Sequence, residues 1–313
     1  MSEWPIPSSE RMNEIFESVK NWGRWGPDDE RGALNLITDE CRRAAAAAVR
    51  HGRAVSCGRD IAVEPDLDNP HPALHMMIQA GDDCVIPGYG LETTLDFVGL
   101  SFHGMASSHI DALCHVLRKG KMYNGYPANE VKSTGARRNA ISVANDGIVA
   151  RGVLFDMPRT LGVPWLELGQ LITPDQLEAA EAAQDVRVRE GDVLVVCVGR
   201  DARRAELGNW VPVEGGMAGL HPECLPWLHE RGVAVLGCDG ISDSLPGLAI
   251  EDWPMPIHEC TLVAMGVHLL DNLKLDELSK ACDELSQWEF QLSVAPLRIA
   301  GGTGSPANPI AML

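Results

Sequence analysis

Through the middle of the chain, hydrophobic and polar positions alternate between short apolar runs and amphipathic stretches. Two nearly all-apolar runs, Asp192–Val198 and Val233–Cys238, have the length and composition of strands that are buried on both faces. A helix is predicted between them, over 222–231. A strand over 152–156 and a helix that opens with a capping box at Thr173–Gln176 come before them. This order of strands and helices predicts an α/β fold.

Further elements are predicted on both sides of this region. An alanine-rich helix is expected over 39–51, with Thr38 as its N-cap. Later in the chain we expect, in order, strands over 93–100 and 101–111, a strand over 267–270, a helix over 275–285 and a strand over 289–299.

The segment 107–115 concentrates side chains that bind metals or transfer protons, because it contains His109, Asp111 and His115. Neutral imidazole nitrogens and carboxylate oxygens are common ligands of divalent transition metals. The spacing alone supports a second interpretation equally well. In that interpretation Asp111 is the N-cap of a following helix, His109 is a buried core histidine and His115 lies on the helix by chance.

The predicted strand over 101–111 adds further side chains to this cluster. Because alternate residues of a strand share a face, His103 and Ser107 are expected on the same face as the histidine and aspartate of the cluster. A helix beginning at the aspartate would keep His115 on that side as well. His258, at a predicted junction of loop and helix, is either another ligand from a distant part of the chain or a capping histidine.

Composition narrows the class of partner. The 313 residues carry a formal charge of −18, which repels nucleic acid and anionic membranes, so a small-molecule substrate is expected. No run of uncharged apolar residues has the length of a spanning helix, and the first residues lack the order of a signal peptide, so we expect a cytoplasmic protein. The nine cysteines never occur as CxxC, which gives no indication of a disulfide framework or a thiolate zinc site.

Residues 1–52 form a tryptophan-rich and helical N-terminal segment. Trp22 and Trp25 lie in a loop punctuated by glycine and proline. Such a pair is compatible with core packing or with a pocket wall, and Trp25 is the candidate for substrate contact.

The cluster carries a family resemblance. His103-Gly104 followed by 108–115 resembles the signature H-x-G-T-H-x-D-x-P-x-H of the cyclase-like metal-dependent hydrolases, which include kynurenine formamidases, isatin hydrolases and trans-dienelactone hydrolases. The segments 22–38, 219–239 and 266–278 resemble the longer members of that family. The resemblance implies one α/β domain over 1–313, with a mixed sheet, a barrel-like core and surrounding helices. It also implies a homodimer or homotetramer.

The resemblance also implies roles for individual residues. His109 and Asp111 match ligands of a divalent metal, zinc or manganese, and His115 matches the histidine that acts as acid and base beside the metal. His258 matches a later histidine that joins the metal centre in some members.

Two positions depart from the family pattern. Met105 stands where the signature has its first histidine, and His103, two residues earlier, is the candidate to replace it as a ligand. Asp271 lies one residue further from His258 than the ligand glutamate of the two-zinc members, and its side chain is one methylene shorter. We therefore expect about one divalent ion per chain.

The reaction implied is hydrolysis of a cyclic amide, imide or lactone, or of a formamide. His115 would take a proton from water and return it to the leaving atom, with Ser107 or a nearby amide as donor to the oxyanion. The alternatives are a metal-dependent lyase or cyclase acting on an enolisable substrate, and a metal-free binding protein with the same fold, which Met105 favours.

Overall fold

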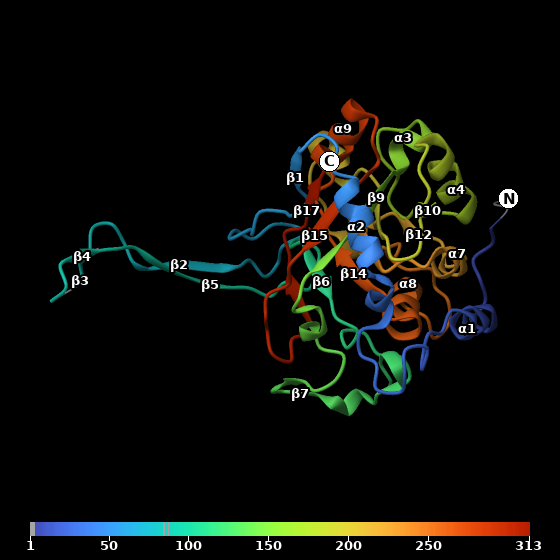
Figure 1. Ribbon diagram of the computed structural model, residues 1–313, viewed down its shortest axis with the longest axis horizontal. Coiled ribbons are helices and arrows are strands. Elements are labelled where there is room, and N and C mark those ends of the chain that lie inside the picture. Colours follow the sequence, from blue (N-terminus) through green and yellow to red (C-terminus); the bar gives the residue numbers. More distant parts are fainter. Residues whose placement is uncertain (1–3, 84, 87) are drawn as a thin grey trace.

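A computed structural model describes residues 4–83, 85–86 and 88–313, and a curled, half-barrel sheet of nine strands lies at its centre (Figure 1). The strand order is β1-β17-β15-β9-β11-β13-β14-β6-β16. The strands are β1 (Ala54–Ser56), β6 (His109–Asp111), β9 (Ile148–Asp156), β11 (Val193–Cys197), β13 (Val235–Cys238), β14 (His268–Asp271), β15 (Glu289–Val294), β16 (Gly304–Pro306) and β17 (Ile310–Met312). Strands β9, β11, β13 and β14 run parallel, and their flanking neighbours pair antiparallel. The predicted mixed α/β sheet with a barrel-like core is confirmed.

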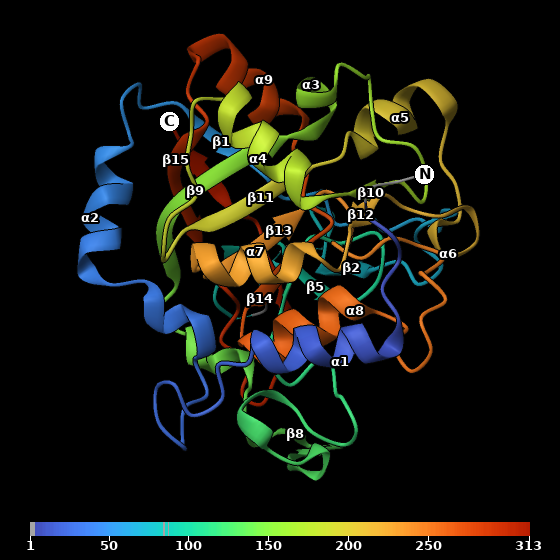
Figure 2. The ribbon, with the colours of Figure 1, turned by 90° about the vertical axis from the view of Figure 1, so that its right-hand side faces the viewer.

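Helices surround this sheet, and Figure 2 shows α1, α4, α7 and α8 in front of its strands. The longer helices are α1 (Ser9–Ser18), α2 (Asp39–Ala47), α4 (Pro174–Ala183), α5 (Arg200–Leu207), α7 (Cys224–Arg231) and α9 (Asp276–Leu285). The shorter ones are α3 (Met157–Leu161), α6 (Pro212–Gly215), α8 (Pro256–His258), the 3-10 turns η1 (Gly32–Leu36), η2 (Tyr123–Gly125), η3 (Ala128–Glu130) and η4 (Ile141–Ala144), and the π-helical η5 (Glu259–Met265). The predicted cap at Thr38 and the predicted capping box at Thr173 are both present.

Both faces of the sheet are buried, which explains the continuous apolar runs in the sequence. On β11, Leu194 and Val196 belong to a core shared with α4 and α7, whereas Val193 and Val195 belong to a core shared with α9. Alternate side chains of one strand therefore pack into two different cores.

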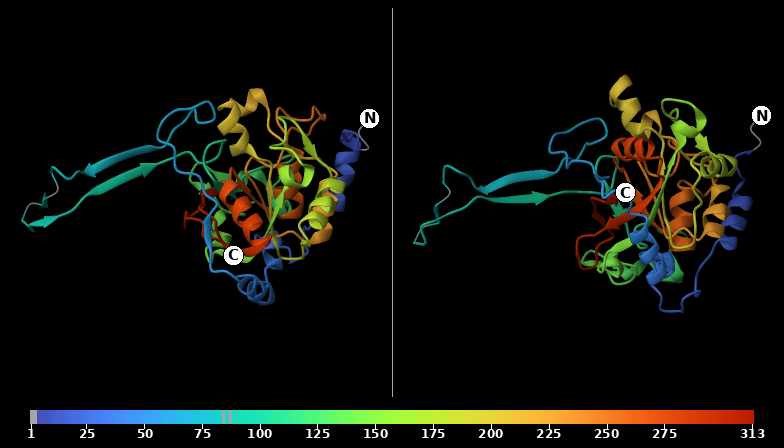
Figure 3. Two further views of the ribbon diagram at one scale, coloured as in Figure 1. Left: turned by 90° about the horizontal axis from the view of Figure 1, so that it is seen from above. Right: turned by 45° about the horizontal axis from the view of Figure 1, so that its top comes forward.

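Four small two-stranded ladders lie outside the main sheet. Strands β10 (Leu171–Ile172) and β12 (Gly219–Leu220) form one, and β7 (Val131–Lys132) and β8 (Gly135–Ala136) form another. Strands β2 (Leu74–Gln79) and β5 (Leu95–Gly99) pair with each other, and β3 (Val85–Ile86) pairs with β4 (Leu91–Glu92). Figures 1 and 3 show β2 to β5 as a long hairpin that projects away from the rest of the chain.

The predicted strand over 101–111 is wrong for most of its length, because only 109–111 is strand. The segment before it is a loop, in which Gly104 has a φ of 141° that a side-chain-bearing residue rarely adopts. No helix begins at Asp111, which removes the interpretation of this aspartate as an N-cap; a turn closed by His115 N–H and the carbonyl of Ala112 follows instead. Among the described residues, no helix combines the length and the apolar character needed to cross a bilayer.

Candidate metal centre

Strand pairing brings three candidate ligands together. In the antiparallel ladder of β6 and β14, His109 lies opposite Asp271 and Asp111 lies opposite Leu269. Directly opposed residues point to the same side of a sheet, as do residues two apart on one strand. His109, Asp111 and Asp271 therefore share a face, and His258 at the end of α8 approaches the same face.

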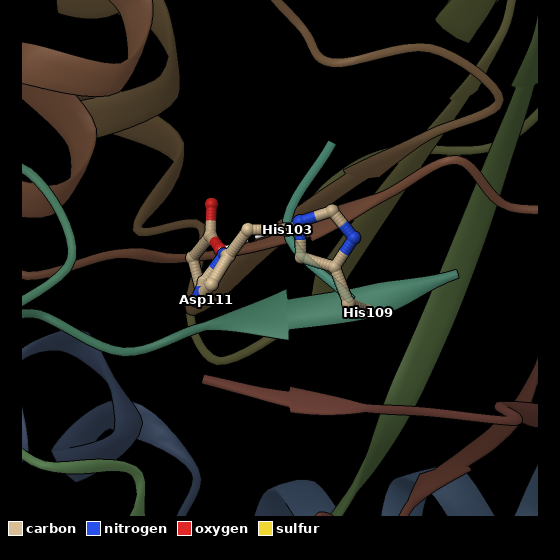
Figure 4. Close-up of side chains that lie close together, drawn as sticks. All are labelled: His103, His109 and Asp111. Carbon is tan, nitrogen blue, oxygen red and sulfur yellow. Dashed lines mark ion pairs between the residues drawn. The ribbon is translucent and has the colours of Figure 1, made fainter. Parts of the chain in front are cut away.

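One oxygen of Asp111 faces two histidines, and Figure 4 shows the three side chains converging from the loop and from β6. Asp111 Oδ1 lies 3.0 Å from His103 Nδ1 and 3.4 Å from His109 Nε2. The ligand atoms of these three residues all lie within 4.8 Å of one another, which is the spacing of a metal-binding group.

The other oxygen of Asp111 faces a second group. Asp111 Oδ2 lies 3.7 Å from His258 Nε2, and that same nitrogen lies 3.3 Å from Asp271 Oδ2. Asp111, His258 and Asp271 also satisfy the 4.8 Å spacing. The sequence shows Asp271 displaced by one residue from the ligand position of the two-zinc members, and the register of β14 places it directly in this second group.

Each histidine of the two groups is held by the ring nitrogen that faces away from Asp111. His103 Nε2 lies 3.1 Å from the hydroxyl of Thr303, and His109 Nδ1 donates to the carbonyl of Ser107 at 2.9 Å. His258 Nδ1 donates to a carboxylate oxygen of Asp243 at 2.7 Å. Holding the outer nitrogen fixes the ring and leaves the inner nitrogen as an electron-pair donor, which is how proteins orient metal-binding histidines.

The carboxylate of Asp111 fits a cation better than it fits its protein surroundings. Asp111 is fully buried, and neither oxygen has a hydrogen-bond partner in the described structure. Burial alone would raise the pKa of Asp111, but His103 and His109 hold it well below its usual range, so the group is ionised. A buried carboxylate charge is costly unless positive charge neutralises it, and a divalent metal among these side chains would do so; the residues present therefore fit such an ion.

His115 lies beside the two groups without belonging to either. Its ring stacks on that of His103, with centroids 3.9 Å apart and planes 3° apart, and its Nε2 lies 3.9 Å from Asp111 Oδ1. Burial lowers the pKa of His115 to about 4. The imidazole is therefore uncharged at neutral pH and is able to accept a proton.

A cavity of about 240 Å³ opens beside His103. Its lining is mainly apolar and includes residues of the loop before β6 and of α6, among them Phe102, Met105, Ser107, Val211 and Val213. Ser107, the predicted substrate contact, thus lies at the cavity wall. Met105 is part of the same wall and not part of either metal-binding group.

Trp25 does not line this cavity. Its ring is half-buried against the core that contains α1, and the guanidinium of Arg24 lies 4.8 Å from the ring centroid. The described structure shows Trp25 packed against this core, and its contact with substrate stays a prediction.

Sequence reasoning missed the residues that hold the loop before β6. Asn272 donates to the carbonyls of Gly104 and Ser107, and the buried Arg200 donates to the carbonyl of Met105 at 2.6 Å. Arg200 also donates to Asn272 Oδ1 at 2.7 Å. Asn272 directly follows Asp271 and has a φ of 55°, and no signature in the sequence marks either side chain as part of the site.

Comparison with known proteins gives a consistent set of relatives. The family described as "Putative cyclase" matches residues 53–243. The structure of a novel cyclase is 31% identical, with a TM-score of 0.85, and covers 95% of this chain and 99% of its own. No curated protein sequence matches this chain.

Two more distant structures share the fold. Isatin hydrolase A from Labrenzia aggregata, bound to benzyl benzoate, is 21% identical with a TM-score of 0.60, and covers 86% of this chain and 95% of its own. A structure described as a potential metal-dependent hydrolase with cyclase activity is 16% identical with a TM-score of 0.51, and covers 83% of this chain and 96% of its own.

Proposed function

The chain belongs to the cyclase family, and on this premise we propose that it is a metal-dependent hydrolase. Its substrate would be a cyclic amide, imide or lactone, or a formamide, which water converts to a carboxylate. The hydrolase activities named for the more distant structures support this class of reaction.

The orientation of three histidines around one buried carboxylate carries the proposal. In His103, His109 and His258, the ring nitrogen that faces away from Asp111 is hydrogen-bonded to a neighbouring group. The other ring nitrogen of each histidine faces Asp111. The alternative roles, His109 as a core histidine and Asp111 as a helix N-cap, do not account for this orientation of three rings. No helix follows Asp111 for it to cap. The nitrogen and oxygen donors suit zinc or manganese.

The geometry supports two adjacent positions for metal, because each oxygen of Asp111 faces a separate group. His103 and His109 would complete the first position, and His258 and Asp271 the second. A divalent ion held there supplies positive charge that polarises a carbonyl group and makes water a better nucleophile at neutral pH.

His115 is the residue best placed to move the proton. Its uncharged ring accepts a proton from the attacking water while the new carbon–oxygen bond forms. The same proton then passes to the leaving nitrogen or oxygen as the carbon–nitrogen or carbon–oxygen bond breaks. The face-to-face stack on His103 fixes the direction of this ring.

The cavity beside His103 would hold the part of the substrate that does not react. Phe102, Met105 and Val211 give it apolar walls, and Ser107 supplies a hydroxyl at its edge that is able to donate to the developing oxyanion. The cavity volume suits a small ring system rather than a polymer.

The proposal is tested by loading the protein with zinc or manganese and measuring its activity on a panel of compounds. The panel contains isatin, hydantoins, lactones and formamides. We expect at least one compound to be hydrolysed, with oxygen-18 from labelled water in the carboxylate product. Turnover without incorporation of the label would favour a lyase or cyclase. A protein that binds panel compounds but neither holds metal nor turns them over would support the binding-protein alternative and overturn the proposal.

A further inference from the structure

Three separate segments of the chain form the walls of the cavity beside His103. Residues 67–71 form the first wall, residues 101–107 the second and residues 211–213 the third. The first two segments are loops, and the third begins the short helix α6. Because the ladder of the nine-stranded sheet does not fix these segments, their relative positions depend on contacts made by side chains.

A buried ion pair between Arg200 and Asp68 joins the first wall to the second. Arg200 Nη2 lies 3.0 Å from Asp68 Oδ2, and only 2% and 4% of the two side chains are exposed. The same nitrogen of Arg200 donates to the carbonyl of Met105 in the second wall at 2.6 Å. Arg204, one turn further along α5, donates to Asp68 Oδ2 at 3.1 Å. Asp68 therefore links its own wall to α5, and Arg200 links both to the loop before β6.

The third wall is tied to the other oxygen of Asp68. Asn209 Nδ2 donates to Asp68 Oδ1 at 3.0 Å, and Asn209 Oδ1 accepts from the amide of Trp210 at 2.9 Å. The indole nitrogen of Trp210 donates to the carbonyl of Gly216, directly after α6, at 2.9 Å. A chain of hydrogen bonds thus runs from Asp68 to both ends of the short helix in the third wall.

The other guanidinium arm of Arg200 contacts a residue beside the candidate metal centre. Arg200 Nη1 donates to Asn272 Oδ1 at 2.7 Å, and Asn272 directly follows Asp271. The side-chain amide of Asn272 donates to the carbonyl of Gly104, which adjoins His103. One guanidinium group is therefore connected to the cavity walls and to the neighbours of one ligand from each metal-binding group.

Packing alone does not account for a charged side chain in this position. Burial lowers the pKa of Arg200 to about 10, so the guanidinium is still charged at neutral pH. Removing such a charge from water is costly, and apolar residues often fill the same space with no loss of stability. A planar guanidinium, however, holds several acceptors at fixed angles, which neither an apolar side chain nor a lysine is able to do.

We propose that Arg200 and Asp68 are positioning residues that fix the three cavity walls relative to one another and to the metal centre. They would thereby set how tightly the part of the substrate that does not react is bound, without touching the reacting atoms. The effect on substrate binding rests on the proposed hydrolase function. The effects on the order of the walls and on metal affinity do not depend on turnover.

Hydrogen exchange with mass spectrometry tests the order of the walls without any substrate. In the first wall the amides of Asp66 and Asn69 each donate to the carbonyl of the other, and the amides of Gly215 and Gly216 donate within and after α6. We expect Asp68→Asn to speed exchange at both places about tenfold or more, because the neutral side chain no longer forms the ion pair. Wild-type exchange rates at both places in this variant would overturn the proposal.

Metal affinity tests the connection to the loop before β6. Arg200→Lys keeps the positive charge but replaces the fork by one nitrogen, which cannot hold Asp68, Asn272 and the carbonyl of Met105 together. We expect about tenfold weaker zinc binding in competition with a chromophoric chelator, because the loop that carries His103 loses a support. A folded Arg200→Lys protein with wild-type zinc affinity would overturn the connection. Should this variant fail to fold, hydrogen exchange in Asp68→Asn decides the proposal.

The matched controls are Arg151→Lys and Asp192→Asn, which alter another buried ion pair whose arginine also donates to a carbonyl. Both should lower the melting temperature and leave wall exchange and zinc affinity unchanged. Equal effects in these controls would assign Arg200 and Asp68 to stability alone and overturn the proposal.

Kinetics tests the effect on substrate binding. For any panel compound that the wild type hydrolyses, we expect Asp68→Asn to raise KM about tenfold while kcat falls less than about threefold. An unchanged KM would overturn the effect on substrate binding. If the wild type hydrolyses no compound, the proposed function fails, whereas hydrogen exchange and zinc affinity still decide whether the two residues position the walls.

Discussion

Asp243 holds His258 by two hydrogen bonds to the same carboxylate oxygen, one from the backbone amide at 2.9 Å and one from the ring Nδ1 at 2.7 Å. Its other oxygen accepts from the amide of Ile257 at 2.9 Å. The imidazole is thereby fixed with Nε2 toward Asp111 and Asp271.

We expect Asp243→Asn to weaken metal binding by about 10- to 100-fold, because a neutral side-chain amide oxygen accepts from the ring Nδ1 more weakly than the carboxylate does and raises the basicity of Nε2 less. Competition with a chromophoric chelator measures the affinity. The control is Asp156→Asn, which alters another buried aspartate that accepts a backbone hydrogen bond at a helix start. That control should lower the melting temperature and leave the metal affinity unchanged, and equal losses of affinity in both variants would assign Asp243 to folding alone.

Asp271→Asn is expected to reduce the metal content from about two ions per chain to about one, because it neutralises a ligand of the second group only. Elemental analysis after dialysis gives the count. Asp111→Ala, which removes the residue shared by both groups, should lose nearly all metal and the rise in melting temperature that added zinc or manganese produces. One ion in both the wild type and Asp271→Asn would restore the expectation from the sequence and argue against a second position.

His115→Asn should retain its metal while turnover falls by roughly a hundredfold or more, because the variant lacks the group that accepts the proton. Burial lowers the pKa of His115 to about 4, so the wild-type base is uncharged above that value and becomes protonated only in more acidic solution. The acid limb of the turnover profile should therefore lie below the ordinary histidine range and should be lost in the variant. Exposed His51→Asn is the control, and a loss of metal in His115→Asn would instead make His115 a ligand.

Phe102→Leu is expected to raise KM with a smaller change in kcat, because its ring forms part of the cavity wall and supplies binding that is uniform along the reaction. Trp25→Leu should lower the melting temperature by removing packed aromatic surface and should leave KM unchanged. Steady-state kinetics gives KM and kcat for both variants, and thermal melts give their melting temperatures. A raised KM in Trp25→Leu would return that tryptophan to the substrate pocket.

Much of the sheet was predictable because its strands are buried on both faces and its helices carry local start and stop signals. Residues 193–197 and 235–238 lie within predicted strands, and the box at Thr173 opens a helix as expected. The strand over 289–299 ends early, at Val294, before Pro296. Proline lacks the amide that a continued ladder needs.

The candidate centre was only partly predictable, because its geometry depends on long-range pairing. His109, Asp111 and His115 lie close in sequence, and their spacing is visible. The place of Asp271 follows from its register with β6, more than 150 residues earlier in the chain, which no local pattern encodes. His103 approaches Asp111 from a loop that hydrogen bonds from Asn272 and Arg200 hold in place. The sequence therefore predicted that His103 lies near Asp111, but it predicted a strand where the chain forms a loop.

The position of β6 between β14 and β16 has a consequence for the order of events during synthesis. The strand that carries His109 and Asp111 emerges from the ribosome well before either strand that pairs with it. Until residues 268–306 have been made, β6 has no partner strand, so Asp111 and the histidines near it in sequence are not held in the geometry of the metal site. We infer that metal capture is a late step, and that a nascent chain arrested before β14 would bind zinc or manganese no better than an unfolded peptide.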